Sequence, residues 1–307
     1  MQHVRYVCGC LLLFSNFCAF YELLCFEYDK YVMFHIFSTA VFTSFQKAHR
    51  SAHKKECRKR AKELHEEALF RQPETPDDCP ICFLPLSYVE EQSAYQTCCG
   101  KFLCIGCVNT VEQMESGWES CAFCRVDRPS REGEVFERLE DRLEKYNDPT
   151  AGFSLGICHA NGKYGLSEDR EKAHEYYLRA AKLSSSQATF RLSLNYYNGD
   201  GCDVDKAKAW SYLEEAAIMR HLEARTVLAI EETKRGNMER GGRHRMIAAV
   251  MGDDESMSVV KNLYSLGHVK KDEFEVTLRK HHAWKEEIKS EQRKEAKEAR
   301  MDYVGPT

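Results

Sequence analysis

Eight cysteines between residues 79 and 124 form four closely spaced pairs, and their thiols are the side chains of this chain best suited to chemistry. The pairs are Cys79/Cys82, Cys98/Cys99, Cys104/Cys107 and Cys121/Cys124. A C-x-x-C pair on a tight turn can place two thiolates on one metal ion, about 2.3 Å from each sulphur, and two pairs complete a tetrahedron. Eight thiolates therefore predict two closed, structural zinc sites.

The alternative use of these thiols is a set of four disulfides in a secreted domain. The flanking chain is charged and repeat-like rather than a loop-rich disulfide scaffold, which favours intracellular metal binding. The sequence shows no glycine-rich phosphate loop, catalytic triad or paired-carboxylate site, so we expect no catalytic residue of the chain's own.

The order of the pairs resembles a RING finger in its all-cysteine variant. Cys79-Pro80-Ile81-Cys82 is an opening that RING fingers often use, and Thr97 to Cys107 resembles their central knuckle. RING fingers cross-brace their ligands, which implies two sets of four: Cys79, Cys82, Cys104 and Cys107 on one zinc, and Cys98, Cys99, Cys121 and Cys124 on the other. Because this segment has little apolar core, metal binding would supply most of its folding free energy, about 10 kcal/mol or more per site.

The resemblance also implies a function in ubiquitin transfer. RING domains bind a ubiquitin-conjugating enzyme and position its thioester, and the family's docking positions correspond here to Ile81 and Arg125. Two positions depart from the family: Ala122 replaces the usual proline, and the aromatic residue expected near Val111 is missing, with Trp118 closer to Cys121. The alternative is a zinc-stabilised adaptor or scaffold without ligase activity.

Length and composition indicate a multi-domain protein that is not dominated by membrane spans. At 307 residues, two or three domains are expected, and charged residues make up 30% of the chain. The net charge of −4 favours no nucleic-acid partner. We expect an intracellular protein, cytoplasmic or nuclear, with membrane association only if its first segment acts as an anchor.

Residues 1–46 form an apolar leader that differs from the rest of the chain. Its two uncharged runs, Val7 to Tyr21 and Tyr31 to Phe45, are shorter than the roughly 18 to 20 residues that span a bilayer. Arg5 precedes the first run, but no clear cleavage site follows it. We interpret the leader as poorly structured or an isolated helix, from translated non-coding sequence or a wrongly chosen start. A signal peptide or membrane segment is the alternative.

Residues 47–72 form a predicted basic helix whose start resembles the tail of a MYND zinc finger. His53 and Cys57 match the closing H-x-x-x-C of that family. The upstream cysteines do not have the family's spacing; they are Cys8, Cys10, Cys18 and Cys25. A solvated helix is therefore the preferred interpretation. Between Lys47 and Lys62, Glu56 is the only acid, and nuclear import or nucleic-acid binding is a further possibility. Gln72-Pro73 ends the helix and leads into the finger, residues 73–130.

The chain after residue 130 changes to helical periodicity and then to a repeat. Residues 131–147 are expected to be a linker helix with apolar positions at Val135, Phe136, Leu139, Leu143 and Tyr146. The run Ala151 to Ile157 recurs at Ala188 to Leu194, and Lys172-Ala173 recurs as Lys208-Ala209. A third Ala-Ala pair, Ala248-Ala249, indicates a shorter, degenerate copy from Ala224.

The repeated residue types predict stacked helical hairpins. Alanine pairs let two helices approach closely, Phe153, Leu155, Tyr176 and Leu178 fill the space beside them, and Asn-Gly turns permit positive φ. The pattern resembles Sel-like repeats, relatives of tetratricopeptide repeats, over residues 148–265. The resemblance implies a mainly α fold, a helical solenoid behind a small two-zinc finger, whose curved surface binds a protein substrate or adaptor.

Residues 266–307 form a predicted charged C-terminal helix. Phe274, Leu278, Trp284 and Ile288 lie near one face and should pack on the last repeat. We expect the Lys/Glu-rich end of this helix to extend into solvent, and His281 with His282 to be solvated.

Overall fold

The computed structural model describes residues 39–114 and 119–303, so most of the apolar leader predicted for residues 1–46 lies outside the described residues. Two compact units divide the chain, Met1–Ala68 and Leu69–Thr307. The first unit contains most of α3 (Thr39–Leu69), the basic helix, which ends shortly before Gln72-Pro73. None of the described helices combines the length and apolar character needed to cross a bilayer.

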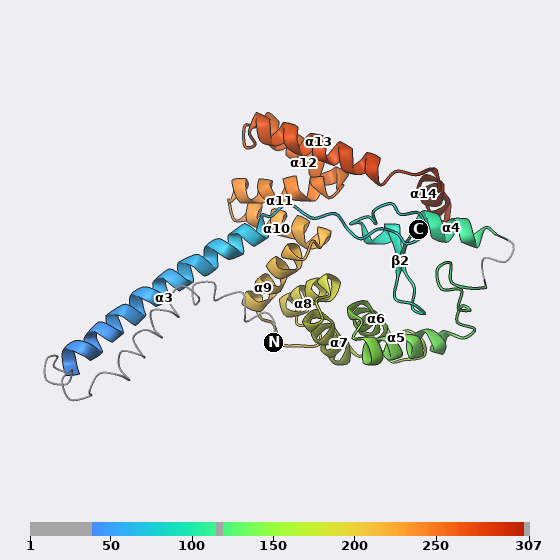
Figure 1. Ribbon diagram of the computed structural model, residues 1–307, viewed down its shortest axis with the longest axis horizontal. Coiled ribbons are helices and arrows are strands. Elements are labelled where there is room, and N and C mark those ends of the chain that lie inside the picture. Colours follow the sequence, from blue (N-terminus) through green and yellow to red (C-terminus); the bar gives the residue numbers. More distant parts are fainter. Residues whose placement is uncertain (1–38, 115–118, 304–307) are drawn as a thin grey trace, which may run out of the picture. The chain divides into compact units, whose positions relative to one another are not determined.

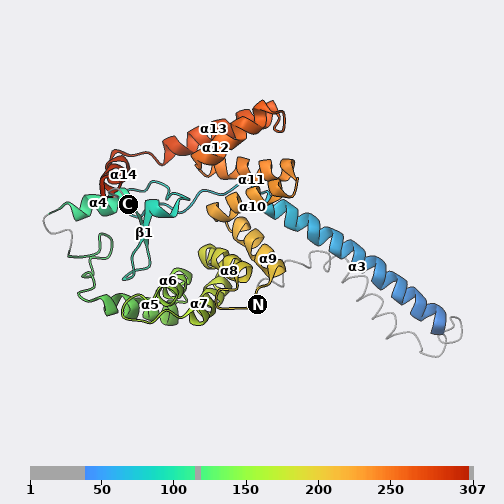
Figure 2. The same cartoon turned by 180° about the vertical axis from the view of Figure 1, so that it is seen from behind.

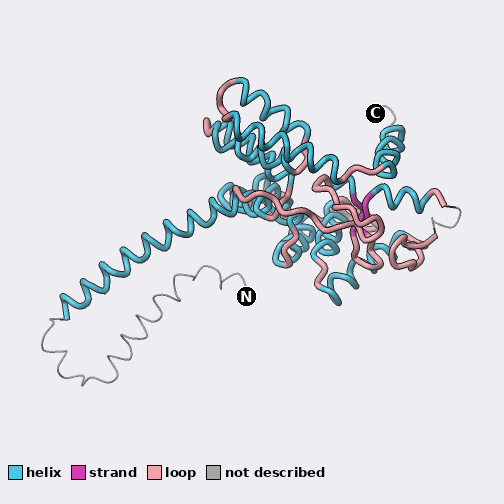
Figure 3. Tube along the Cα trace, turned by 45° about the horizontal axis from the view of Figure 1, so that its top comes forward, coloured by secondary structure: helices cyan, strands magenta, loops and turns pink. Residues whose placement is uncertain are grey.

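The second unit begins with a small cysteine-rich module. A short 3-10 helix, η1 (Glu90–Gln92), leads into β1 (Ser93–Tyr95), which pairs antiparallel with β2 (Phe102–Cys104). The register places Ser93 opposite Cys104. Helix α4 (Ile105–Glu112) follows β2 directly, and the strands are the only ones in the described part of the chain (Figure 3). This hairpin and helix carry the second and third cysteine pairs.

The remainder of the unit is helical, which confirms the mainly α fold (Figure 1). Three successive helical hairpins follow the linker helix α5 along the chain. They are formed by α6 with α7, α8 with α9, and α10 with α11. The bounds are α5 (Glu132–Tyr146), α6 (Pro149–Ala160), α7 (Arg170–Lys182), α8 (Ser186–Asn198), α9 (Lys206–Ile218), α10 (Leu222–Lys234), α11 (Met238–Val250), α12 (Asp254–Ser265), α13 (Lys271–Glu287) and α14 (Glu291–Tyr303).

The ends of these helices are set by local sequence. A short polar side chain caps most of the N-termini by accepting backbone N–H groups, as at Asp148, Asp169, Ser185, Asp205 and Asp253. Ser184 and Arg220, which follow α7 and α9, adopt the left-handed conformation with φ near +68° and +67°. The next residue then donates to a carbonyl in the last turn of the helix, which closes each end. The predicted Asn-Gly turns are present, with φ of +60° at Gly162 and +85° at Gly199.

The core of the repeats contains the small and large residues that the sequence pattern assigned to it. The alanine pairs lie at the helix contacts, and Ala180, Ala216 and Ala248 have no exposed surface. Phe153 and Leu155 are buried beside them. Tyr146 was predicted to share the apolar face of α5, but it is 68% exposed because it lies at the end of the helix.

The prediction of one C-terminal helix that ends in solvent is wrong. Ile288 terminates α13, and the hydroxyl of Ser290 accepts from the backbone N–H of Arg293 at 3.2 Å to start α14. The break lets α14 pack on α4 of the cysteine-rich module, as both Figures 1 and 2 show. His281 is buried rather than solvated, because it bonds the carbonyl of Ala249 at 2.7 Å.

Candidate metal centre

The structure gathers the eight cysteines into two groups of four. Cys79, Cys82, Cys104 and Cys107 form the first group, and Cys98, Cys99, Cys121 and Cys124 form the second. Within each group the sulphur atoms lie within 4.8 Å of one another. The groups interleave along the chain in the order that the cross-braced RING pattern implies.

The first group combines a tight turn with the start of a helix. The N–H of Phe83 donates to the carbonyl of Cys79 at 2.9 Å, so the C-x-x-C segment folds back on itself. The second pair of thiols comes from the N-terminus of α4, where Cys104 is the N-cap residue. Backbone N–H groups point at the sulphurs: that of Cys104 lies 3.4 Å from Cys79 Sγ, and that of Cys107 lies 3.4 Å from Cys104 Sγ. Such donors favour thiolates.

The last cysteine pair repeats the local fold of the first pair. The N–H of Arg125 donates to the carbonyl of Cys121 at 2.9 Å, as Phe83 does to Cys79. Phe83 and Arg125 both have a left-handed backbone, with φ of +58° and +60°. Each turn is closed by an isolated bridge, Asp78 with Pro85 in the first and Ser120 with Asp127 in the second. Two equivalent knuckles therefore supply one cysteine pair to each group.

The Cys98-Cys99 doublet lies on the turn between β1 and β2. The N–H groups of Cys99 and Gly100 both donate to the carbonyl of Gln96, at 3.3 and 2.7 Å. Gly100 has φ of +70°, a conformation that glycine adopts without strain. This turn points two adjacent cysteines to the same side, so a doublet can replace a C-x-x-C pair.

The thiols of each group differ in how readily they ionise without a cation. Burial raises the pKa of a thiol, but backbone donors from Cys104, Cys82 and Ile81 outweigh it and lower the pKa of Cys79 to about 7. Burial and the neighbouring Cys104 thiol raise the pKa of Cys107. In the second group, burial is likewise outweighed at Cys121, whose pKa is lowered, whereas burial and nearby thiols raise the pKa of Cys98. One thiolate in each group is therefore favoured, and further ionisation requires a positive charge.

The donor set and spacing fit zinc. Sulphurs that bind one zinc ion tetrahedrally at about 2.3 Å lie about 3.8 Å apart. Cys82 Sγ and Cys104 Sγ are 3.7 Å apart in the first group, and Cys98 Sγ and Cys124 Sγ are 3.3 Å apart in the second. No disulfide joins any of these eight cysteines, and the two groups are the metal-binding candidates among the described residues. Cys57, from the MYND-like segment, is exposed and belongs to neither group.

The predicted partner-binding residues lie on the two knuckles. Ile81 is half-buried and packs against the cysteines of the first group. Arg125 is exposed directly after the last cysteine. The neighbouring Phe83, which the sequence analysis did not single out, is 75% exposed. Trp118 lies in the segment 115–118, outside the described residues.

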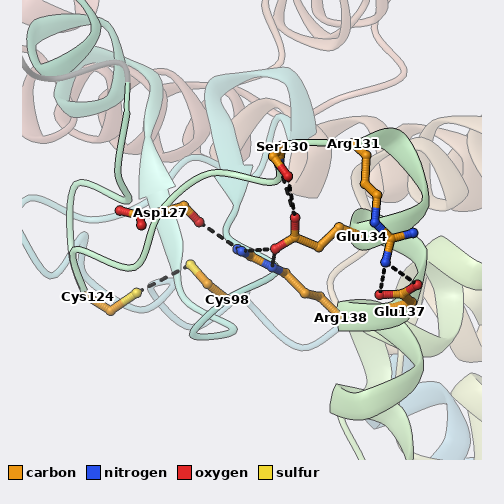
Figure 4. Close-up of polar contacts among 8 residues, drawn as sticks. All are labelled: Cys98, Cys124, Asp127, Ser130, Arg131, Glu134, Glu137 and Arg138. Carbon is orange, nitrogen blue, oxygen red and sulfur yellow. Dashed lines mark hydrogen bonds and ion pairs between the residues drawn. The ribbon is translucent and has the colours of Figure 1, made fainter.

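Polar contacts join the segment after the second knuckle to helix α5, as Figure 4 shows. Arg138 donates to the carbonyl of Asp127 at 2.9 Å and pairs with Glu134 at 2.5 Å. Glu134 in turn accepts from the backbone N–H of Ser130 at 3.0 Å. The segment that leaves the second knuckle is therefore tied to the first two turns of α5.

A half-buried polar contact joins the β-hairpin of the module to the first repeat. Arg142 Nε lies 2.7 Å from the carboxylate of Asp148 and 3.0 Å from the hydroxyl of Tyr95. Tyr95 also donates to Asp148 at 2.8 Å. A Cβ at Gly100 would overlap the Arg142 guanidinium, so glycine permits this close approach. Sequence periodicity gave no signal for this contact, because its members are far apart in the chain.

Leu69, the last residue of α3, and Phe70 are anchored in the repeats. Leu69 has no exposed surface and packs in the core of the second hairpin. The guanidinium of Arg225 donates to the carbonyls of Leu69 and Ala217. Burial lowers the pKa of Arg225 to about 10. Phe70 lies 4.6 Å from the ring of His244, centroid to centroid. The sequence analysis missed this anchor because it treated residues 47–72 as solvated.

Comparison with known proteins supports the repeats. The family model for the Sel1 repeat matches residues 150–185 and 186–221, which confirms the two full repeats predicted from sequence. Stacked helical repeats of this kind form protein-interaction scaffolds. Comparison with curated proteins finds no match.

Several solved structures are similar over part of the chain. A Sel1 repeat protein from Oxalobacter formigenes is 19% identical, with a TM-score of 0.42, over 49% of this chain and 63% of that one. Cysteine rich protein B from Helicobacter pylori is 27% identical, with a TM-score of 0.30, over 31% and 71%. A protective antigen of uropathogenic Escherichia coli with an SLR fold is 20% identical, with a TM-score of 0.42, over 57% and 40%. This chain thus spans less than two thirds of the first and third proteins.

Proposed function

We propose that residues 73–130 form a RING-type finger that holds two zinc ions, one in each cysteine group. The observation that carries this proposal is the interleaved pair of four-thiol groups, each built from one knuckle and one further cysteine pair. Bound zinc would supply no redox chemistry and no catalytic water, because four protein ligands close each site. Its role would be to neutralise the thiolates and fix the module.

We further propose that this finger acts as a ubiquitin-protein ligase. Ile81 and Arg125 are the residues expected to contact a ubiquitin-conjugating enzyme, and the exposure of Arg125 and Phe83 on the knuckles supports an accessible surface there. The effect would be positional: the finger would hold the thioester of the conjugating enzyme in a reactive pose.

The repeats would recruit the protein to be modified. A cleft of about 500 Å³ lies between the module and the repeats, lined by Tyr88 and Phe102 on one side and by Phe153 and Arg220 on the other. It combines aromatic rings, hydroxyl groups and one guanidinium, a mixture suited to a peptide segment. In this arrangement the substrate segment and the conjugating enzyme would contact the same module.

A second candidate function is a zinc-containing adaptor without ligase activity. The observation that favours it is the packing of α14 on α4, which covers one face of the module with a helix of this same chain. Ala122 at the position of the family's proline points the same way. An adaptor would use the module to fix the geometry of the repeats.

Reconstituted autoubiquitination with a panel of conjugating enzymes separates the two functions. If the protein is a ligase, the wild type forms ubiquitin conjugates, and Ile81→Ala and Arg125→Ala each lower the rate at least tenfold with two zinc ions still bound. Arg131→Ala is the matched control, because Arg131 is exposed and pairs with Glu137 instead. A zinc-loaded wild type that is inactive with the whole panel identifies the adaptor.

A further inference from the structure

Arg293, on the C-terminal helix, reaches the first cysteine group. Its guanidinium donates to the carbonyls of Pro85 and Leu84, at 2.8 and 3.2 Å, and one of its nitrogens lies 3.7 Å from Cys82 Sγ. It also donates to the carbonyl of Ile288 at 3.0 Å, which fixes the side chain at the start of α14. A residue more than 200 positions from Cys82 thus closes over the first knuckle.

The backbone of α14 lies against α4 at a single glycine. A Cβ at Gly106 would stand 2.8 Å from the backbone N of Arg293 and 2.9 Å from the carbonyl carbon of Gln292, so the two helices are in direct backbone contact. Gly106 lies between Cys104 and Cys107, both in the first group. Glycine inside a helix costs about 1 kcal/mol relative to alanine, and this contact supplies a reason for it. Ala296, one turn along α14, is 2% exposed.

The two cysteine groups differ in the side chains that surround their negative charge once metal is bound. Four thiolates around one divalent ion leave a net charge of −2 at each site. The Arg293 guanidinium partly offsets this charge at the first group. At the second group, the neutral amide oxygen of Gln96 lies 3.7 Å from Cys121 Sγ. The first site therefore has a guanidinium in its outer shell, where such partners tune metal affinity.

We propose that Arg293 is a positioning residue of the first metal site, and that metal binding there and docking of α14 on α4 are coupled. This inference rests on the proposed two-zinc module. Metal in the first group fixes Cys82 and the knuckle carbonyls to which Arg293 donates. It also fixes the start of α4, on which α14 packs. The docked helix then holds the metal more tightly, because the coupling of two binding events is reciprocal. The second metal site does not share the coupling.

The full-length protein tests the coupling with four variants. Arg293→Ala removes the contact to the first group, Arg293→Lys keeps the charge but loses the fork of donors, and Gly106→Ala blocks the approach of α14 while keeping Arg293 and all eight thiols. Lys294→Ala is the matched control, because Lys294 is exposed and pairs only with Glu291 among described residues. Zinc affinity is measured by chelator competition, and detachment of α14 by hydrogen exchange of peptides from residues 291–303.

We expect Arg293→Ala and Gly106→Ala to lower the affinity for one of the two zinc ions about tenfold or more, the range seen for outer-shell partners. The affinity for the other zinc ion should not change. Both variants, and chelation of the wild type, should speed exchange in α14. Arg293→Lys should fall between the wild type and Arg293→Ala, and Lys294→Ala should match the wild type. If Arg293→Ala fails to fold, Gly106→Ala and Arg293→Lys carry the test.

Two results would overturn the coupling. One is faster exchange of α14 in Arg293→Ala and Gly106→Ala with both zinc affinities unchanged, and the other is an α14 that stays protected after the metal is removed. A wild type that binds no zinc would instead defeat the proposed function itself. Zinc content of the wild type therefore tells the two failures apart.

Discussion

At the residue scale, the thiols of the two cysteine groups differ in how readily each ionises. Cys79 and Cys121 face backbone donors, and their pKa values are lowered, that of Cys79 to about 7 from an ordinary 9.0. Cys107 and Cys98 are buried near other thiols, and their pKa values are raised. Metal binding must therefore displace protons from the second kind of thiol, and this makes metal affinity depend on pH.

We predict that bound zinc falls as the pH is lowered, because protons compete with the metal for thiolates. Without metal, the pKa of the Cys79 thiol is lowered to about 7, so protons compete more strongly with zinc for this sulphur as the pH falls below that value. Zinc per chain after dialysis at pH 8, 7, 6 and 5 measures this. Cys79→Ser should leave at most one zinc at pH 8, whereas Cys158→Ser, a buried cysteine of the first repeat, should keep two. Equal zinc content in both variants would contradict the assignment.

His244 is a buried base whose neutral form the fold requires. It is fully buried, and burial followed by the charges of Arg225, Arg240 and Arg243 lowers its pKa to about 3 from 6.5. When a group's folded pKa is lower than its unfolded one, the unfolded chain takes up the proton first as the pH falls. Stability contributed by neutral His244 is therefore present above pH 6.5 and is lost as the pH falls toward 3.

We predict that in His244→Gln the free energy of unfolding of the repeats falls less as the pH is lowered. One proton taken up only on unfolding changes the free energy of unfolding by about 1.4 kcal/mol per pH unit. Urea unfolding at pH 7 and pH 5 should show a smaller loss in the variant than in the wild type. His282→Gln is the control, because His282 is exposed on α13. An equal loss in the variant and the wild type would exclude this role for His244.

At the element scale, capping decides where the repeat helices begin. The Ser185 hydroxyl accepts from the N–H of Ala188 at 3.2 Å and is buried between two hairpins. We predict that Ser185→Ala lowers the free energy of unfolding by about 1 kcal/mol, the usual cost of losing such a cap. Chemical denaturation measures the change. The control is Ser186→Ala, one position along. The side chain of Ser186 makes no capping bond among the described residues, so this variant should change stability less.

The same scale explains why the C-terminal prediction was wrong. The predicted apolar face ends at Ile288, but no glycine or proline follows it before Gly305, so the sequence pattern gives no reason to divide the helix. The break between α13 and α14 allows a distant contact instead. Helix α14 packs on α4 at Gly106, where glycine lets the backbones of these two helices touch. Ser290 is a favourable N-cap residue, but its role becomes visible only once the direction of α14 is known.

At the scale of the whole second unit, the module contacts both ends of the helical array. The Tyr95–Arg142–Asp148 contact joins it to α5 and α6, and the rings of Tyr88 and Trp284 join it to α13 with 5.1 Å between centroids. Metal that stabilises the module should therefore stabilise the array as well, since binding to the folded form shifts the folding equilibrium.

We predict that chelating the metal lowers the unfolding temperature of the helices, not only that of the module. Arg142→Ala should weaken this effect and cost about 1–3 kcal/mol, because it leaves the half-buried Asp148 carboxylate and Tyr95 hydroxyl without their shared cation. Circular dichroism at 222 nm with and without chelator measures both. Arg131→Ala removes an exposed pair and should leave the effect intact. Helices that unfold at the same temperature with and without metal would show the two parts to be independent.

The sequence by itself determined the features that depend on neighbours in the chain. Paired cysteines at short spacing, alanine pairs and Asn-Gly turns at a steady period, and the break at Gln72-Pro73 all act through local geometry, so the repeats and the candidate ligands could be predicted from residue types. Tertiary structure alone decided which distant side chains meet: Arg142 at Gly100, Arg225 at Leu69 and Arg293 at Cys82. The reason is physical, because a guanidinium carries several donors on a long, flexible stem, and nothing in its local sequence states which distant carbonyl or thiolate it will reach.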